Sequence, residues 1–513
     1  TRWNWQTQVF YEKQWGDHGF DVLGGLELSE EQTDLDYASG TGFTDPELLN
    51  AVADALQDDD PDTVTDERFS NQTYRTDINN NSRVSFYGQL NYDYKGKYFF
   101  LANFRRDESS VFGSDSNVAY NGGAGLSWVV SKENFLNDTP WLDFLRLRTS
   151  YGSTGNSRIG SYRALGLYNR RINSGYNGLT EATPSAAPNP QLSWERNLKY
   201  NAGLDLNLFG RLQLTAEYYY DDLRDLITSR DIPSENGFSS LQLNAAQMYN
   251  TGLEFSARVQ WVDSKKFKWN TSFNIATLKN EVTDLVGLGS DYSTAARALA
   301  QRIGYSTSAI WGLDWAGIDP ATGRDLIRYN DQVYDLATYR SLYTEANWQP
   351  IGDSQPDAYG GFSTSFQFGN SLSLSVRGSY QIGGEYLADY QLISQYNFTT
   401  SRNLSVNAFD YWRDPGDTSA LQPLVSSSNP IAANMSKYLY DATFVKLSNI
   451  NLTYNVPIHT LKVPLDQLSV FLDVSNVAYW YKDKSPAGRN GIREFRFTYP
   501  QARTISLGVK TSF

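Results

Sequence analysis

The stretch PQARTISLGVKTSF, residues 500–513, bears most directly on the fold of this 513-residue chain. One set of alternate positions is mainly apolar and ends on an aromatic ring: Ile505, Leu507, Val509, Thr511 and Phe513. The other set is small or polar: Ser506, Gly508, Lys510 and Ser512. Because successive side chains of a strand point to opposite faces, the segment predicts a β-strand between two unlike environments.

This tail has two interpretations. A final strand that ends on phenylalanine is typical of bacterial outer-membrane β-barrels, in which Ile505, Leu507, Val509 and Phe513 would form the signal for barrel assembly. A soluble β-sandwich that happens to end in phenylalanine is the alternative. Mean hydropathy is -0.50 and no apolar run approaches the roughly 18 residues of a membrane helix, which leaves a barrel open. The 35 tyrosines, 26 phenylalanines and 13 tryptophans favour the barrel, whose aromatic girdles need such rings.

Composition excludes several classes of function. With no cysteine, the chain has no disulfide, thiolate metal site or cysteine nucleophile. Its two histidines, His18 and His459, are far apart, and no nucleophile-elbow or phosphate-loop motif occurs, so we expect neither an enzyme nor a bound cofactor. The net charge of -13 argues against nucleic acid as a partner. The acidic run with Asp58, Asp60 and Asp62 is a weak calcium candidate, but it lacks the spacing of an EF-hand and is better interpreted as a solvated loop.

The same two-residue period recurs along the chain. In 200–208 and 212–220 leucine, alanine and tyrosine alternate with polar residues, and in 371–380 the polar positions are mostly serine. A polar face rich in Asn, Ser, Gln and Gly suits a water-filled lumen. The alternation slips within 443–456, which predicts a β-bulge near Ser448-Asn449.

The connections between these strands fall into two length classes. Short ones are expected at 16–17, 95–96, 132–142, 209–210, 263–266, 369–370 and 457–465. Long ones, expected to be extracellular loops, are 31–81, 154–195, 223–247, 282–356, 385–442 and 478–499. Short periplasmic turns that alternate with long outer loops are typical of an outer-membrane barrel, if 308–318 does not span. Counting back from Phe513 gives about 15 strands, and because an odd number cannot close such a barrel, we expect the chain to be incomplete.

Several collinear blocks of this sequence resemble one family, the SusC/RagA-type TonB-dependent outer-membrane transporters of Bacteroidota. The blocks are HGFDVLGGLE (18–27), SFYGQLNYDYKGKYFFLANFRRDESSVFG (85–113), LRLRTSYGSTGN (145–156), NPQLSWERNLKYNAGLDLNLF (189–209), EYYYDDLRDLI (217–227), IGDSQPDAYGGFSTSF (351–366), DATFVKLSNINLTYNVP (441–457), LSVFLDVSNVAYW (468–480) and YPQARTISLGVKTSF (499–513).

The resemblance implies an all-β fold, a transmembrane antiparallel β-barrel of 22 strands around an N-terminal plug. Residues 1–513 would be the C-terminal portion of that barrel, with about 15 strands present and the plug absent. It also implies a multi-pass protein of the bacterial outer membrane. Its partners would be outer-membrane lipid, the remaining N-terminal barrel and plug segment, TonB acting through that plug, and a SusD-like surface lipoprotein. A dimer of transporter–lipoprotein units is left open.

The resemblance further implies TonB-dependent active import of an oligomeric nutrient, a glycan or a peptide. A non-transporting or passive barrel that serves as a porin or assembly scaffold is the alternative, and a siderophore receptor is a weaker one. The residues expected to contact substrate or lipoprotein are the aromatic rings of the long loops: Trp311, Trp315, Trp348, Tyr386, Tyr390, Tyr396 and Trp412. These rings could equally pack the loops together. Arg105 and Arg106 are expected to pair with Asp107 or Glu108 rather than with substrate.

Overall fold

The computed structural model describes residues 1–39, 73–171, 176–238, 240–285, 302–335, 348–387, 412–417, 434–458, 465–483 and 501–512. Within these residues no helix is long and apolar enough to cross a membrane. Nearly all regular structure is β-strand, with a few 3-10 turns.

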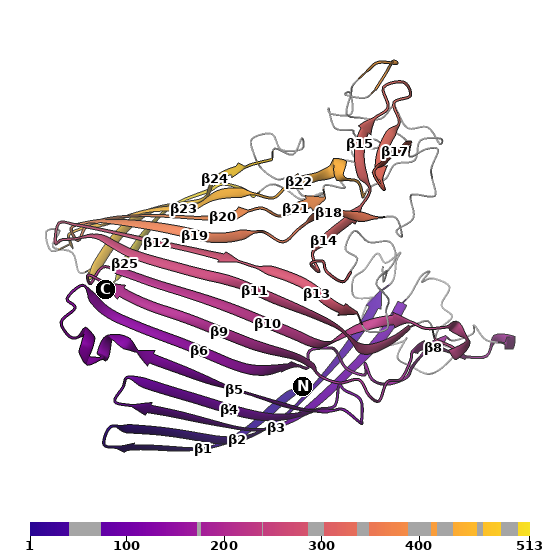
Figure 1. Ribbon diagram of the computed structural model, residues 1–513, viewed down its shortest axis with the longest axis horizontal. Helices are drawn as coiled ribbons and strands as arrows, with labels where there is room; N and C mark the ends of the chain where they lie inside the picture. Colours follow the sequence, from indigo (N-terminus) through magenta and orange to yellow (C-terminus); the bar gives the residue numbers. More distant parts are fainter. Residues whose placement is uncertain are drawn as a thin grey trace.

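One large antiparallel sheet forms a curved wall (Figure 1). Among the described residues, fifteen strands follow one another along this wall, which confirms the expected number of about 15. In order they are β1 (Arg2–Trp15), β2 (His18–Ser39), β3 (Thr73–Tyr94), β4 (Tyr98–Ser109), β5 (Val118–Val129), β6 (Leu142–Asn156), β9 (Glu195–Leu208), β10 (Leu212–Asp231), β11 (Ser240–Asp263), β12 (Phe267–Thr277), β19 (Ala358–Phe368), β20 (Leu372–Ile382), β23 (Phe444–Asn455), β24 (Gln467–Tyr481) and β25 (Thr504–Ser512).

Short turns join the strands at one end of the wall, on the left of Figure 1. Gly96 and Gly210 have positive φ values of 58° and 62°, a backbone conformation that glycine adopts without a steric penalty from a Cβ atom. The turn between β5 and β6 is longer and contains two 3-10 turns, Val130–Lys132 and Asn134–Leu136. The order of strands then follows the chain, because each short turn returns the chain beside the strand that it has just left.

The predicted bulge lies in β23. Its pairing with β20 skips Ser448, since Arg377 faces Asn449 whereas Gly378 faces Leu447. The pairing of β23 with β24 is also shifted between Leu447 and Asn449. The extra residue returns the apolar side chains on both sides of it to the same face, as the sequence requires.

Strand β11 pairs with two successive strands rather than one. Its residues Glu254–Asp263 pair with β12, and Ala246–Thr251 pair with the short strand β13 (Lys279–Leu285). The ladder is interrupted at Leu278, whose carbonyl oxygen accepts a 2.5 Å hydrogen bond from Gln355 Nε2. Strands β12 and β13 are therefore two parts of one wall strand that is broken near its outer end.

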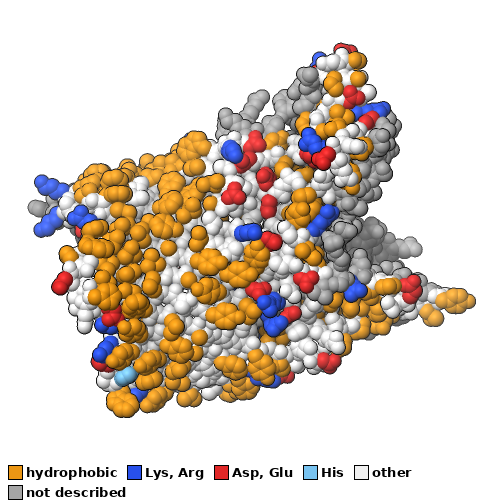
Figure 2. All heavy atoms as spheres, in the orientation of Figure 1, with side chains coloured by type: hydrophobic (Ala, Val, Ile, Leu, Met, Phe, Trp, Pro, Cys, Tyr) orange, Lys and Arg blue, Asp and Glu red, His pale blue; other side chains and the backbone are white. Residues whose placement is uncertain are grey.

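The wall has two unlike faces. On one face of β10 lie Leu214, Ala216 and Tyr218, and on the other lie Thr215 and Glu217. Figure 2 shows hydrophobic side chains gathered over the half of the wall nearest the short turns, whereas charged side chains lie mostly toward the other end. This is the distribution expected of a barrel whose apolar belt contacts lipid and whose outer rim contacts water.

In the described part of the chain, four small sheets lie outside the wall sheet, toward the end opposite the short turns (Figure 1). They pair β7 (Leu167–Arg171) with β8 (Glu181–Ala186), β14 (Ala309–Gly312) with β18 (Gln349–Asp353), β15 (Asp314–Ile318) with β16 (Asp325–Tyr329) and β17 (Gln332–Asp335), and β21 (Glu385–Leu387) with β22 (Leu439–Asp441). The segment 308–318 thus forms strands that do not join the wall. The wall ladder also extends into segments expected to be loops, since β2 pairs with β3 as far as Ser39 and Thr73.

Candidate functional site: the inner wall and the outer loop cluster

The polar face of the wall, called the inner wall here, carries charged side chains that bond one another. On β2 to β4, Arg105 donates to Asp107 Oδ1 at 2.6 Å and to Glu27 Oε2 at 2.9 Å. Ser85 is buried and donates to Asp107 at 2.6 Å. Arg106, on the opposite face, bonds Glu108 at 3.0 Å. Both predicted arginine pairings are therefore present.

A second cluster crosses β6, β9 and β10. Arg148 donates to Glu217 Oε2 at 2.6 Å, and Arg146 approaches Asp205 at 2.8 Å. A Cβ atom at Gly203 would lie 2.6 Å from the Arg148 guanidinium carbon, so glycine at this position leaves room for the arginine. Alternating acids and bases on neighbouring strands make the inner wall polar but nearly neutral here, which suits a passage for polar solutes.

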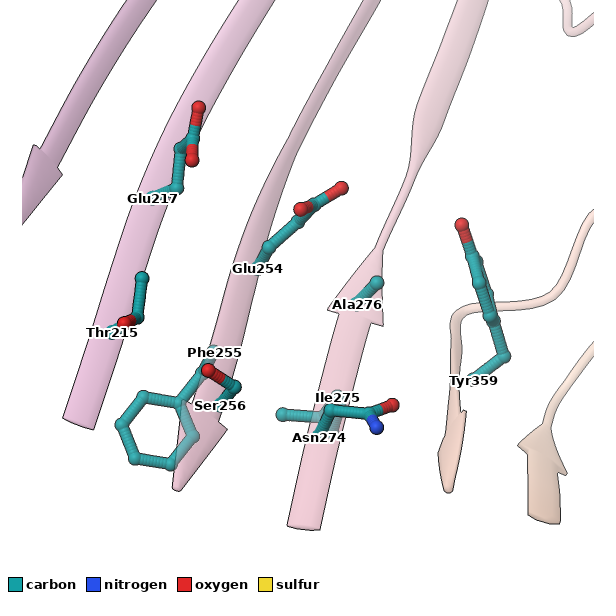
Figure 3. A pocket seen from close by; sticks show the side chains of 9 residues that line it. All are labelled: Thr215, Glu217, Glu254, Phe255, Ser256, Asn274, Ile275, Ala276 and Tyr359. Atoms are coloured by element: carbon teal, nitrogen blue, oxygen red, sulfur yellow. The ribbon is translucent and has the colours of Figure 1, made fainter. Parts of the chain in front are cut away.

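Beside this cluster lies a hollow of about 270 Å³ on β10, β11, β12 and β19. Figure 3 shows the carboxylates of Glu217 and Glu254 on neighbouring strands, on the same side of the sheet as Tyr359. Asn274 and Ser256 also line the hollow. Two carboxylates, an amide, a hydroxyl and a phenol together offer hydrogen-bond acceptors and donors to a passing ligand.

A second region, the outer loop cluster, consists of β14 to β18, β21, β22 and the residues 302–308 and 434–438. Trp311 on β14 is 1% exposed and contacts Tyr305 edge-on, with ring centroids 4.8 Å apart. The Arg302 guanidinium lies 4.1 Å from the centre of the Trp311 ring, and Trp348 packs against the same cluster. Trp311 thus lies in the interior of the cluster and Trp348 packs against it partly buried, which is the packing alternative considered for these rings.

An ion pair buried in the cluster joins segments that are distant in sequence. Lys437 Nζ lies 3.2 Å from Asp325 Oδ1, and their side chains are 6% and 1% exposed. Trp315 Nε1 donates to the same oxygen at 2.9 Å. Burial raises the pKa of Asp325, against the attraction of Lys437 and the hydrogen bond from Trp315. Asp325 Oδ2 is buried and has no hydrogen-bond partner among the residues that the structure describes.

The other predicted aromatic residues occupy different places. Tyr386 stacks on Tyr440 between β21 and β22, with centroids 5.8 Å apart. Trp412 Nε1 donates to the Pro320 carbonyl oxygen at 3.1 Å, which ties 412–417 to the turn after β15. Tyr390, Tyr396, Phe513 and the calcium candidates Asp58, Asp60 and Asp62 lie outside the described residues, as does His459.

The terminal strand β25 pairs with β24 along its whole length. Ile505, Leu507 and Val509 are 67%, 77% and 63% exposed and alternate along one face of this outermost strand. Their role as an assembly signal stays a prediction.

Sequence reasoning did not single out the residues of the hollow. Thr215, Glu217, Ser256 and Asn274 stand at alternate positions of their strands and were visible only as the polar half of the two-residue period. Which polar positions lie side by side depends on the register between neighbouring strands. The sequence of a single strand does not determine that register.

Comparison with known proteins identifies the family. The family model described as "TonB dependent receptor-like, beta-barrel" matches residues 1–477. The chain belongs to this family. The antiparallel wall formed by the described residues agrees with the β-barrel named in that family model.

Relatives with curated names extend the comparison. The chain is 28% identical to TonB-dependent receptor P39 of Formosa agariphila over 86% of this chain and 47% of that protein. It is 27% identical to TonB-dependent receptor SusC of Bacteroides thetaiotaomicron over 98% of this chain and 49% of that protein. The chain therefore spans about half the length of the relatives that it matches. These relatives are named as receptors rather than as enzymes.

Solved structures agree on the fold. The structure titled "Structure of the RagAB peptide transporter" superposes with a TM-score of 0.84 at 24% identity, covering 99% of this chain and 55% of that one. The RagAB peptide importer in its "closed-closed" state gives a TM-score of 0.83. The resemblance to SusC/RagA-type proteins is confirmed, and the chain is part of an outer-membrane β-barrel.

Proposed function

We propose that this chain forms most of the barrel of a transporter that imports an oligomeric nutrient, a glycan or a peptide, in a TonB-dependent manner. The observation that carries the proposal is the match of residues 1–477 to the TonB-dependent receptor barrel, joined to an inner wall lined with paired charges. TonB would act through the plug segment that the resemblance to SusC/RagA-type transporters implies.

The inner wall supports a polar cargo. Charges on β6, β9 and β10 are compensated in pairs such as Arg148–Glu217 and Arg146–Asp205, so this part of the described wall presents both signs of charge. The hollow at Glu254 and Tyr359 offers hydrogen-bonding groups without a metal-binding cluster, since the described residues hold no group of three or more potential metal ligands. These hydrogen-bonding groups fit a polar cargo such as a sugar or a peptide.

The outer loop cluster supports a surface lipoprotein of the SusD type as partner. Although Trp311 is buried, Ile303, Tyr305 and Val333 remain exposed on the same cluster. Exposed apolar side chains at the water-facing end of a barrel are available for contact with a partner protein. We infer that Val333, at the β16–β17 hairpin, belongs to the surface that the lipoprotein covers.

We expect this chain to import its cargo without catalysing the cleavage of a covalent bond in it. His18 is the histidine that the structure describes, and its Nδ1 is 2.8 Å from the Tyr92 hydroxyl while its ring packs on Tyr94. All three rings stand on the apolar face beside a short turn, away from the hollow. This arrangement supports a role in the aromatic girdle rather than in catalysis.

Uptake measurements test the proposed function. A strain that lacks the gene and is complemented with the full-length protein should accumulate either labelled oligopeptides or labelled oligosaccharides, and deletion of TonB should abolish this uptake. Accumulation that persists at full rate without TonB would favour the passive porin. A folded barrel that transports neither class in either strain would favour the assembly scaffold.

The partner is tested separately. Val333→Asp should lower the amount of lipoprotein that copurifies, whereas Leu165→Asp, at an equally exposed site outside the cluster, should leave it unchanged. Equal retention by both variants would mean that the β16–β17 hairpin is not part of the contact surface.

A further inference from the structure

The apolar face of the wall contains a groove that the proposed transport does not use. It has a volume of about 360 Å³ and is lined by Tyr98 on β4, Leu126 and Trp128 on β5, and Leu147 and Thr149 on β6. The adjacent residues Phe99, Ser127 and Arg148 complete the lining. The first five residues share the outward face, since Tyr98 faces Trp128, Trp128 faces Leu147, and Leu126 faces Thr149 in the ladder. The volume is within the range of small-ligand sites, about 300–1,000 Å³.

The end of the groove nearest the short turns is held rigid by one carboxylate. Glu133, in the β5–β6 turn, accepts hydrogen bonds from the Tyr98 hydroxyl at 2.7 Å and from Trp128 Nε1 at 3.1 Å. The two rings stack with centroids 6.3 Å apart and planes 10° apart. Because both polar tips are fixed at the turn, the flat faces and edges of the rings are presented as a preformed wall of the groove.

The β5–β6 turn and the neighbouring β3–β4 turn provide positive charge at the level of the lipid headgroups. Lys97 Nζ lies 3.2 Å from Glu133, and Lys132 donates to the Gly96 carbonyl oxygen at 2.8 Å while its side chain remains exposed. An ammonium group at the membrane surface attracts anionic lipid headgroups. The groove thus begins beside a cation at the water interface and continues into the apolar belt.

We propose that this groove is a binding site for one phospholipid of the periplasmic leaflet, with an acyl chain between Trp128 and Leu147 and the phosphate near Lys132. The occupant follows from continuity with the lipid-facing surface of the wall and from the charge at its mouth. A ladder of outward side chains elsewhere on the wall contacts lipid that exchanges freely. A groove with one side fixed by hydrogen bonds retains a lipid longer than such a ladder does. Its side chains are already ordered, so less of their conformational entropy is lost when the lipid binds.

Retention of lipid through purification tests the site. The full-length protein is extracted from outer membranes in mild detergent and examined by native mass spectrometry. About one phospholipid per chain should remain bound to the parent protein. Leu126→Trp, which fills the groove, should lower this occupancy at least fivefold. Leu452→Trp, on the outward face of β23, is the matched control and should retain the lipid.

Two further outcomes keep the test decisive. Lys132→Glu should lower phospholipid occupancy about threefold while leaving the heat-dependent gel shift of a folded barrel unchanged. A parent protein that carries only detergent, or a loss that is equal in Leu126→Trp and Leu452→Trp, would overturn the proposal. If Leu126→Trp instead changed the oligomeric state without changing bound lipid, the groove would be a contact between proteins.

Discussion

The wall and the outer loop cluster are stabilised in different ways. Along the wall, side chains alternate between two surfaces, and large apolar residues such as Phe86, Leu126 and Leu147 remain exposed for lipid to cover. The outer loop cluster instead buries Trp311, Ile327 and Met435 almost completely, as a small soluble domain does. The wall therefore depends on its backbone ladder and on the membrane, whereas the cluster depends on side-chain packing and one buried ion pair.

The largest expected effect is a loss of stability in the outer loop cluster that leaves the wall folded. Lys437→Met leaves the carboxylate of Asp325 buried without its counter-charge, and breaking such a pair costs about 3–5 kcal/mol. The outer loop cluster should then become sensitive to protease while the wall still shows its heat-dependent gel shift. The double variant Asp325→Asn, Lys437→Met should recover most of the resistance, because no buried charge remains. If the double variant is as sensitive as the single one, the pair is not what holds the cluster.

The complementary change targets the wall. Leu374→Lys places a charge on the lipid-facing side of β20 and should cost about 2–4 kcal/mol near the middle of the membrane. Ser373→Lys, one position along on the inner wall, should be tolerated. Urea-dependent unfolding in lipid vesicles measures both. Similar unfolding midpoints for the two variants would contradict the assignment of the two faces.

A smaller effect on the stability of the outer loop cluster is expected when the pH is lowered. The sign of this effect differs between two carboxylates of the cluster. Burial opposes ionisation of Asp441, but hydrogen bonds from Lys482 and Thr443 outweigh it and lower the pKa of Asp441 to about 2. A lowered pKa contributes stability above the usual value of 3.8 that is lost as the pH falls toward 2. Because the pKa of Asp325 is raised, its contribution has the opposite sign and grows as the pH falls from neutral toward 3.8.

Hydrogen exchange of the two segments checks these signs. Amides of β21 and β22 should lose protection between pH 4 and 2, once the intrinsic exchange rate is corrected for, and Asp441→Asn should remove that dependence. Amides of 434–438 should gain protection as the pH falls through the raised pKa of Asp325, and Asp325→Asn should abolish the gain. A loss of protection in 434–438 over that range would contradict the raised pKa.

The smallest effect serves as the control for the buried pair. Arg328 Nη1 lies 3.1 Å from Asp314 Oδ2 on the surface of the same cluster, with both side chains partly exposed. Exposed pairs of this kind contribute about 0–1 kcal/mol. Arg328→Gln should therefore leave protease resistance nearly unchanged, and a large loss would show that the cluster responds to any change of charge.

The sequence alone predicts the wall well and the cluster poorly. The two-residue period in 200–208 and the slip at Ser448 are local patterns that determine faces and a bulge without knowledge of other strands. The contact of Trp315 with Ser436 joins residues 121 positions apart. No local pattern links them, because the pairing depends on how two long loops fold over each other. The hollow at Glu254 and Tyr359 was missed for a related reason, since it forms only when four strands take their register.

The interruption at Leu278 has a mechanical consequence. Strand β13, beyond the break, is bonded to the wall through β11 and to the outer loop cluster through Asn280, whose Oδ1 accepts hydrogen bonds from the backbone N–H and the hydroxyl of Thr307 at 2.8 and 2.9 Å. A load applied to the cluster from outside reaches the wall through this seven-residue strand as well as through β19, β20 and β23, which continue directly into the cluster. Along the route through β13, the break separates the loaded strand from the hydrogen-bonded ladder of β12.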